Sequence, residues 1–191
     1  MVTGFLPFSS YNRNLSQVIV NKLPNIIAEQ QIVKKILPVS WDQSLTQYKK
    51  VLNITKKRPN FCILLGIHSK SKISIEKFSY NWKFGLDIHG KFKFGFIKLG
   101  KPFLKSTKID VENILYELER ISMKIKIQVS RYPGFYICNY IYFWAQIYSN
   151  DKYPVIFIHI PDKADKDFEF EIRAVIKKLI YIIIQKKEYN V

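Results

Sequence analysis

One cysteine of the chain lies where its side chain can act as a nucleophile. Cys138 follows the turn RYPG at 131–134, whose proline and glycine end the preceding strand, and it falls where the next helix should begin. The first amide groups of a helix have no acceptor within the helix, and the helix dipole is positive at this end. This position therefore favours the thiolate form of Cys138 and offers hydrogen-bond donors to a developing oxyanion.

A histidine and a glutamate can complete the chemistry of this cysteine. His159 closes the apolar run VIFIHI and precedes Pro161. Gly66 ends an earlier apolar run, and the segment after it carries Glu76. Ligands of open α/β sheets bind at the carboxyl ends of parallel strands, so we expect Cys138, His159 and Glu76 to leave the same edge of one sheet. A nucleophile, a base and a carboxylate that orients the base would then form a catalytic triad.

Each of these residue types also has a simpler interpretation. A single cysteine is usually a small core side chain, a single histidine is usually a hydrogen-bonded filler, and a single glutamate is usually on the surface. Cys62, within the apolar run FCILLG, is expected in the core, whereas His68 and His89 lie in loop-like segments and are expected to be exposed. Three histidines and two cysteines without metal-ligand spacing predict no zinc site.

The order of apolar patterns predicts the elements that must position these side chains. Short β-branched or aromatic runs alternate with stretches of helical period, which is typical of an α/β fold with helices on both faces of a mostly parallel sheet. We expect strands at 1–3, 31–39, 61–66, 124–129 and 155–160. We expect helices at 14–23, from Ser40 as N-cap, at 110–121, from about Cys138, and after Asp165 or Asp167. Residues 72–99 should form irregular strands or an inserted hairpin.

Length and composition indicate a single domain over residues 1–191. This length suffices for one full hydrophobic core but not for two ordinary domains. The apolar run LIYIII at 179–184 is far shorter than the roughly 20 residues that cross a bilayer, so we expect no membrane association. The chain starts without the pattern of a secretory signal, and two cysteines are too few for a disulfide framework. We therefore expect a cytoplasmic protein with reduced thiols.

The net charge of +16 raises the alternative of a nucleic-acid partner, because clustered lysine and arginine side chains neutralise phosphates. The excess is mostly lysine, however, and its pairs are scattered over the chain, at 34–35, 49–50, 56–57, 177–178 and 186–187. No sequence pattern of a known nucleic-acid-binding module accompanies the charge. The distribution favours a solvated basic surface, and we expect no nucleic-acid partner.

Four segments of the chain resemble the signature regions of pyroglutamyl peptidase I, the pyrrolidone-carboxylate peptidases. They are TGFLPFSSYNRN at 3–14, ISIEKFSYN at 73–81, PGFYICNY at 133–140 and VIFIHIP at 155–161. They occur in the family's order at similar spacing and together extend over nearly the whole chain. The resemblance implies a three-layer α/β/α sandwich and the removal of N-terminal pyroglutamate without a cofactor. It places the family's nucleophile, histidine and glutamate on Cys138, His159 and Glu76.

The resemblance also implies a set of substrate contacts. Pyroglutamate is a flat neutral lactam, so its pocket needs apolar walls and a few backbone hydrogen-bond partners. By resemblance, Phe8 and Tyr136 hold the ring between them, and Asn14 ties down the first loop. Relatives often have phenylalanine where this chain has Tyr136. The implied substrate-binding residues are Phe5, Phe8, Asn14, Gly66, Ile67, Tyr136 and Ile137.

Several segments depart from the family pattern. Ser9-Ser10 replaces a pair of glycines, Leu6 replaces an acidic residue, and GIHSKSK at 66–72 replaces a glycine-rich stretch and is about one residue shorter. WKFGLDIHG at 82–90 replaces a stretch whose arginine is expected to polarise the scissile carbonyl; that arginine falls near Leu86. A backbone N–H group or Lys83 would then have to supply the missing donor.

Three functions remain open from the sequence. The retained triad favours an omega peptidase acting on pyroglutamyl peptides. The altered 66–72 and 82–90 segments favour a divergent family member with impaired catalysis that serves as a binding or regulatory protein. A nucleic-acid-binding module on the basic surface is the third. The sequence leaves the oligomeric state open, including a homo-oligomer.

Overall fold

A six-stranded sheet forms the centre of the molecule. The computed structural model describes residues 1–8, 12–54, 58–120, 124–163 and 165–188. The strands of the sheet, in spatial order, are β11 (Ile127–Ser130), β6 (Ile73–Glu76), β12 (Val155–Pro161), β5 (Cys62–His68), β1 (Val2–Phe5) and β4 (Lys34–Leu37). The long central strands β5 and β12 are paired in parallel along their whole length. They carry the predicted core cysteine and the predicted histidine.

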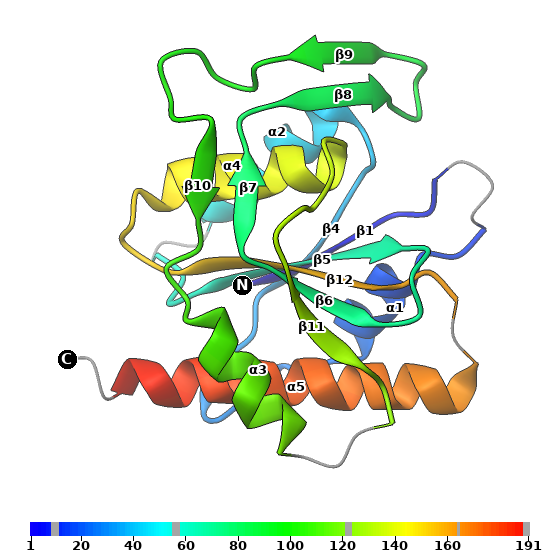
Figure 1. Ribbon diagram of the computed structural model, residues 1–191, viewed down its shortest axis with the longest axis vertical. Coiled ribbons are helices and arrows are strands. Elements are labelled where there is room, and N and C mark those ends of the chain that lie inside the picture. The colour runs from blue at the N-terminus through cyan, green and yellow to red at the C-terminus, as the bar shows by residue number, and fades with distance from the viewer. Residues whose placement is uncertain (9–11, 55–57, 121–123, 164, 189–191) are drawn as a thin grey trace.

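Helices cover both faces of this sheet, which confirms the predicted α/β/α sandwich (Figure 1). One face is covered by α1 (Leu15–Lys22), α3 (Val111–Glu119) and α5 (Lys166–Glu188), and the other by α2 (Trp41–Ile54) and α4 (Ile137–Ser149). Successive side chains of a strand point to opposite faces. In β12, Ile156 and Ile158 therefore join the core under α5, whereas Val155 and Phe157 join the core under α4.

Two strands of the sheet run against the others, and this corrects the sequence analysis. β6 and β11 are parallel to each other, but β6 is antiparallel to β12. The expectation that Cys138, His159 and Glu76 leave one carboxyl edge is therefore wrong. Residues 73–76 were expected in an irregular insertion, yet they form an inner strand. In ISIE the two isoleucines enter the α5 core, while Ser74 and Glu76 are buried on the opposite face of the sheet. Only two residues of this strand are therefore apolar, which is too few to indicate a buried strand from the sequence.

Three smaller ribbons extend from the sandwich. β7 (Phe78–Tyr80) pairs with β10 (Leu104–Ser106), β8 (Lys83–Leu86) with β9 (Phe92–Gly95), and β2 (Ile26–Ile27) with β3 (Gln30–Gln31). The β8–β9 hairpin lies beyond α2 and α4, on the side away from the sheet (Figure 1). It confirms the hairpin expected within 72–99.

The predicted ends of several elements shift in the structure. The strand expected at 31–39 is divided between the end of β3 and β4, and the strand expected at 124–129 begins only at Ile127. The expected end of the third helix, Ile121, lies outside the described residues. Of the two candidate caps for α5, it is Asp165 whose carboxylate accepts the amide of Phe168, at 2.8 Å.

Among the described residues, no helix has the length and apolar character needed to span a membrane.

A buried asparagine joins α4 to the ribbon above it. Asn139 is fully buried, and its side-chain oxygen accepts the amide of Tyr80 at 2.7 Å. Its side-chain nitrogen donates to the carbonyls of Tyr80 and Trp82, each at 2.8 Å. One side chain thus satisfies three backbone groups of the segment that links β7 to β8. This contact fixes the start of α4, where Cys138 lies.

We expect Asn139→Ala to lower the free energy of unfolding by about 3 kcal/mol, because three backbone groups lose their buried partner. Asn53→Ala, at an exposed position of α2, is the matched control and should change stability by no more than about 0.5 kcal/mol. Urea unfolding followed by circular dichroism measures both variants. Equal, small effects of the two substitutions would contradict a structural role for Asn139.

Candidate active site

Cys138 is the second residue of α4, as the sequence predicted for a helix start. Its side chain is half-buried, and Tyr136, the N-cap residue, makes no side-chain hydrogen bond to the end of the helix. The first backbone N–H groups of α4 therefore have neither a helical acceptor nor a capping side chain. A charge that develops on an oxygen near the sulfur would meet these donors and the positive end of the helix dipole.

The absence of a side chain at Gly66 lets α4 approach the sheet. A Cβ atom at this position would lie 2.7 Å from Cζ of Phe157, which is shorter than real contacts of a Cβ atom allow, and 3.0 Å from the sulfur of Cys138, which is tighter than most such contacts. Gly66 therefore provides the space in which the sulfur sits, and it does so from β5, directly opposite His159 in the strand register.

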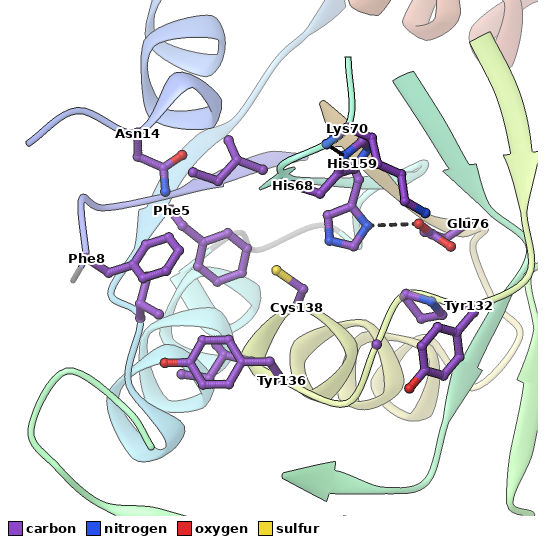
Figure 2. Close-up of a pocket in the computed structure, with 15 residues that line it drawn as sticks. Phe5, Phe8, Asn14, His68, Lys70, Glu76, Tyr132, Tyr136, Cys138 and His159 are labelled. Carbon is purple, nitrogen blue, oxygen red and sulfur yellow. Dashed lines mark hydrogen bonds and ion pairs between the residues drawn. The ribbon is translucent and has the colours of Figure 1, made fainter. Parts of the chain in front are cut away.

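His159 and Glu76 form a buried pair across two adjacent strands. Nδ1 of His159 lies 2.8 Å from Oε1 of Glu76, and the two side chains are almost completely buried. The other ring nitrogen faces the side on which the sulfur of Cys138 lies (Figure 2). The two strands are antiparallel, and Glu76 pairs with Phe157 two residues before His159. Alternation then puts Glu76 and His159 on the same face of the sheet.

The charges of the site determine the protonation of this histidine. Burial by itself would lower the pKa of His159, but the hydrogen bonds and charges of Cys138 and Glu76 outweigh burial and raise that pKa to about 9. The imidazole is therefore held as a cation at neutral pH, with the carboxylate of Glu76 on one side and Cys138 on the other. Such a histidine can return a proton to a leaving group.

These residues border a cavity of about 340 Å³. Cys138, His159 and Glu76 all line it, as do six of the seven predicted substrate-binding residues: Phe5, Phe8, Asn14, Ile67, Tyr136 and Ile137. Gly66, the seventh, lies beneath the sulfur instead. The remaining lining residues were not predicted, and they are Val39, His68, Lys70, Tyr132, Pro133 and Gly134.

The aromatic residues gather on one side of the sulfur. Phe5, Phe8 and Tyr136 lie on the side of Cys138 away from Glu76 and Tyr132 (Figure 2). Asn14 supports this side, because its side chain accepts the amide of Ser16 at 3.0 Å and donates to the carbonyl of Leu6 at 3.1 Å. It thereby caps α1 and ties down the chain that follows β1. The structure describes Phe8 but not Ser9 and Ser10.

The segment 82–90 holds Tyr136 in place but adds no side chain to the cavity. The hydroxyl of Tyr136 donates to the carbonyl of Leu86 at 2.7 Å, and its ring packs edge-on against Trp41. The carboxylate of Asp87 accepts the first amide of α2, from Trp41, at 3.1 Å. Lys83 donates to the carbonyl of Phe96 and does not line the cavity. Of the two candidate donors named from the sequence, Lys83 therefore points elsewhere, which leaves the backbone N–H groups at the start of α4.

The positions of the other cysteine and of two histidines also test the sequence analysis. Cys62 is fully buried in β5, as predicted, and burial raises the pKa of its thiol. His89 is exposed, as predicted. His68 was expected to be exposed, but it ends β5, is half-buried and lines the cavity. The spacing in the sequence could have indicated this position, because a residue two positions after Gly66 faces the same side of the sheet as Gly66.

Among the described residues, no group of histidine, cysteine and carboxylate side chains could hold a metal ion.

We expect the two cavity histidines to titrate at opposite ends of the pH range. The pKa of His159 is raised to about 9, whereas burial and nearby positive charges lower the pKa of His68 to about 4. Protonation of His159 should therefore stabilise the fold fully below its ordinary pKa of 6.5, and this contribution should disappear as the pH rises through about 9.

NMR titration of the imidazole resonances measures both values. In Glu76→Gln the pKa of His159 should fall, because the variant loses the carboxylate charge. A His159 that titrates near 6.5 in the wild-type protein and does not respond to Glu76→Gln would contradict the described pair.

Comparisons with known proteins identify the family of this chain. The family model for pyroglutamyl peptidase matches residues 1–166. The pyrrolidone-carboxylate peptidase of Lactobacillus helveticus (strain DPC 4571) is 31% identical over 168 residues, which cover 84% of this chain and 82% of that protein. The enzyme of the same name from Thermosipho melanesiensis is 27% identical over 173 residues, covering 84% and 81%.

Solved structures show the same fold. The pyrrolidone carboxyl peptidase of Thermococcus litoralis superposes with a TM-score of 0.90 at 22% identity, covering 100% of this chain and 94% of that one. A structure of the pyrrolidone carboxyl peptidase of Pyrococcus furiosus gives a TM-score of 0.87 at 25% identity, covering 97% of each chain. The extent of the family match, together with the fold, shows that this chain belongs to the pyroglutamyl peptidase family of cysteine peptidases.

Proposed function

We propose that this protein is a cysteine exopeptidase, an omega peptidase, that removes N-terminal pyroglutamate from peptides with Cys138, His159 and Glu76 as its triad. One observation carries the proposal: a buried imidazole bonded to Glu76 shares a cavity with a cysteine at a helix start. Family membership supports the substrate class. Each of the three side chains has a role that its position supports.

In the first half of the reaction, the thiolate of Cys138 attacks the carbonyl carbon of the pyroglutamyl residue. A carbon–sulfur bond forms, and the electron pair of the C=O bond moves to the oxygen, which the free N–H groups at the start of α4 stabilise. When the intermediate collapses, the carbon–nitrogen bond breaks. His159 gives its proton to the departing amine, which leaves a thioester on Cys138.

In the second half, a water molecule cleaves the thioester. His159, now neutral, takes a proton from the water as its oxygen attacks the thioester carbon. The carbon–sulfur bond breaks, pyroglutamate leaves, and the thiolate of Cys138 is restored beside the imidazolium. Glu76 keeps Nδ1 of His159 bonded throughout, so the other nitrogen remains directed at the sulfur and the substrate.

The aromatic side of the cavity suits a neutral lactam. Phe8 and Tyr136 offer flat apolar surfaces, and Phe5 closes the space between them and the sheet. Among the residues that the structure describes, this part of the lining carries no charged side chain. An N-terminal glutamine or glutamate with a free amine would have to bury its charge there without a partner, which costs several kcal/mol. The proposed pocket therefore excludes N-terminal residues that have not cyclised.

A divergent family member without turnover remains the second candidate. The observation that favours it is the segment 82–90, which contributes no side chain to the cavity and, by the resemblance, lacks the arginine expected near Leu86. The loss of one oxyanion donor reduces the rate by about 100-fold or more in other hydrolases.

A cytoplasmic location stays a prediction from the sequence, and the oligomeric state stays open.

Hydrolysis of a fluorogenic pyroglutamyl amide by the purified protein separates the two candidates. We expect turnover by the wild-type protein, and a loss of about 1,000-fold or more in Cys138→Ser and His159→Ala, because the nucleophile and the base act as a unit. Glu76→Gln should leave a reduced remainder. Glu119→Gln, which changes an exposed carboxylate on α3, is the matched control and should retain wild-type activity.

The matched glutaminyl amide is the substrate control and should not be cleaved. If His159→Ala kept wild-type turnover, the assignment of the base would be wrong. If the wild-type protein cleaved neither amide, the second candidate would replace the first.

A further inference from the structure

His68 is a second histidine at the catalytic cavity that the proposed mechanism does not use. It follows Gly66 by two residues in β5 and pairs with Pro161 in β12, two residues beyond His159. Its ring packs against the ring of His159, with the centroids 5.4 Å apart and the planes at 62°. The side chain therefore lies beside the base, on the same face of the sheet.

Hydrogen bonds hold this residue in one orientation. Nδ1 of His68 accepts the backbone N–H of Lys70 at 2.9 Å, and the carbonyl of His68 accepts the amide of Asp162, also at 2.9 Å. A neutral imidazole that accepts at Nδ1 carries its proton on Nε2. Among the described residues, this Nε2 has no hydrogen-bond partner, and neighbouring atoms cover it, so a neighbouring side chain must shift slightly before a ligand can reach it from the cavity. A buried donor without an acceptor is unfavourable, which points to an acceptor that a ligand supplies.

The charge state of His68 suits a directional donor. Burial lowers the pKa of His68 to about 4, and the positive charges of His159 and Lys70 act in the same direction. At neutral pH the ring is therefore uncharged, so Nδ1 remains an acceptor for Lys70 and Nε2 remains a donor. A cation at this position would lose the Lys70 contact and repel the imidazolium of His159.

The proposed reaction defines which part of a substrate reaches His68. The leaving amine must lie beside His159, which protonates it, and the proposed pocket puts the lactam on the side of Cys138 where Phe5, Phe8 and Tyr136 are drawn in Figure 2. In a peptide, the next carbonyl carbon is two bonds beyond that amine. His68, whose ring is 5.4 Å from that of His159, lies at a distance that suits a contact with this carbonyl group rather than with the lactam.

We propose that Nε2–H of His68 donates a hydrogen bond to the main-chain carbonyl oxygen of the residue that follows pyroglutamate. His68 thereby favours peptides over substrates whose leaving amine has no such carbonyl group. The inference rests on the proposed function and deepens it, because it assigns a binding group for the leaving side of the substrate.

The test compares two substrates in three proteins. Pyroglutamyl-alanine amide has the carbonyl group in question, whereas a pyroglutamyl aminocoumarin amide has an aromatic ring in its place. We expect His68→Leu to lower kcat/KM for the peptide by about 10-fold, the worth of a typical buried hydrogen bond, and to leave the aminocoumarin amide unaffected. His68→Gln, which retains a donor of similar reach, should restore part of the activity on the peptide.

Equal losses on both substrates would overturn the inference and make His68 a packing partner of His159. Unchanged activity on both would overturn it as well. Failure of the proposed function looks different, because the wild-type protein would then cleave neither substrate, and the inference would fail with it.

A second measurement needs no substitution at His68. In Cys138→Ala protein, the Nε2–H resonance of His68 should shift on titration with pyroglutamyl-alanine amide, and it should not shift with pyroglutamate alone. A resonance that responds to neither compound would contradict the contact, even if His68→Leu does not fold.

Discussion

The hydrogen bond between His159 and Glu76 is the interaction on which the rest of the site depends. It buries an imidazolium and a carboxylate between two helical layers, where an unpaired charge of either sign would be strongly unfavourable. Because the two side chains come from adjacent antiparallel strands, the pairing of β6 with β12 creates the contact. The same pair directs the free nitrogen of His159 toward α4. In the proposed mechanism, the proton that this arrangement holds on the imidazole is the one that His159 gives to the leaving amine.

The position of that sulfur is determined by contacts around the start of α4. Gly66 leaves the space in which the sulfur of Cys138 sits against β5, and Asn139 joins the same turn of the helix to the β7 ribbon. Tyr136, just before the helix, is held by the carbonyl of Leu86. The segment 82–90 therefore supports the aromatic wall through its backbone.

Much of this arrangement could be predicted from local patterns. The apolar runs identified β5 and β12 because both faces of these strands are buried, and RYPG identified the start of α4. The direction of β6 could not be predicted, because ISIE is only four residues long and alternates apolar with polar residues. Such a segment resembles an exposed strand, whereas its polar face is buried here and carries Glu76. His68 was missed for a related reason: it is the first residue of the polar run HSKSK at 68–72, where β propensity gives no signal that the strand continues past Ile67.

The central claim is that Cys138 is the activated thiol of this chain. Its most direct test is the rate of alkylation by iodoacetamide near neutral pH, followed by peptide mapping with mass spectrometry. The sulfur of Cys138 borders the cavity beside an imidazolium, whereas Cys62 is fully buried and burial raises the pKa of its thiol. We expect Cys138 to be labelled at least about 10-fold faster than Cys62 in the folded protein. Equal, slow labelling of both cysteines would contradict the account.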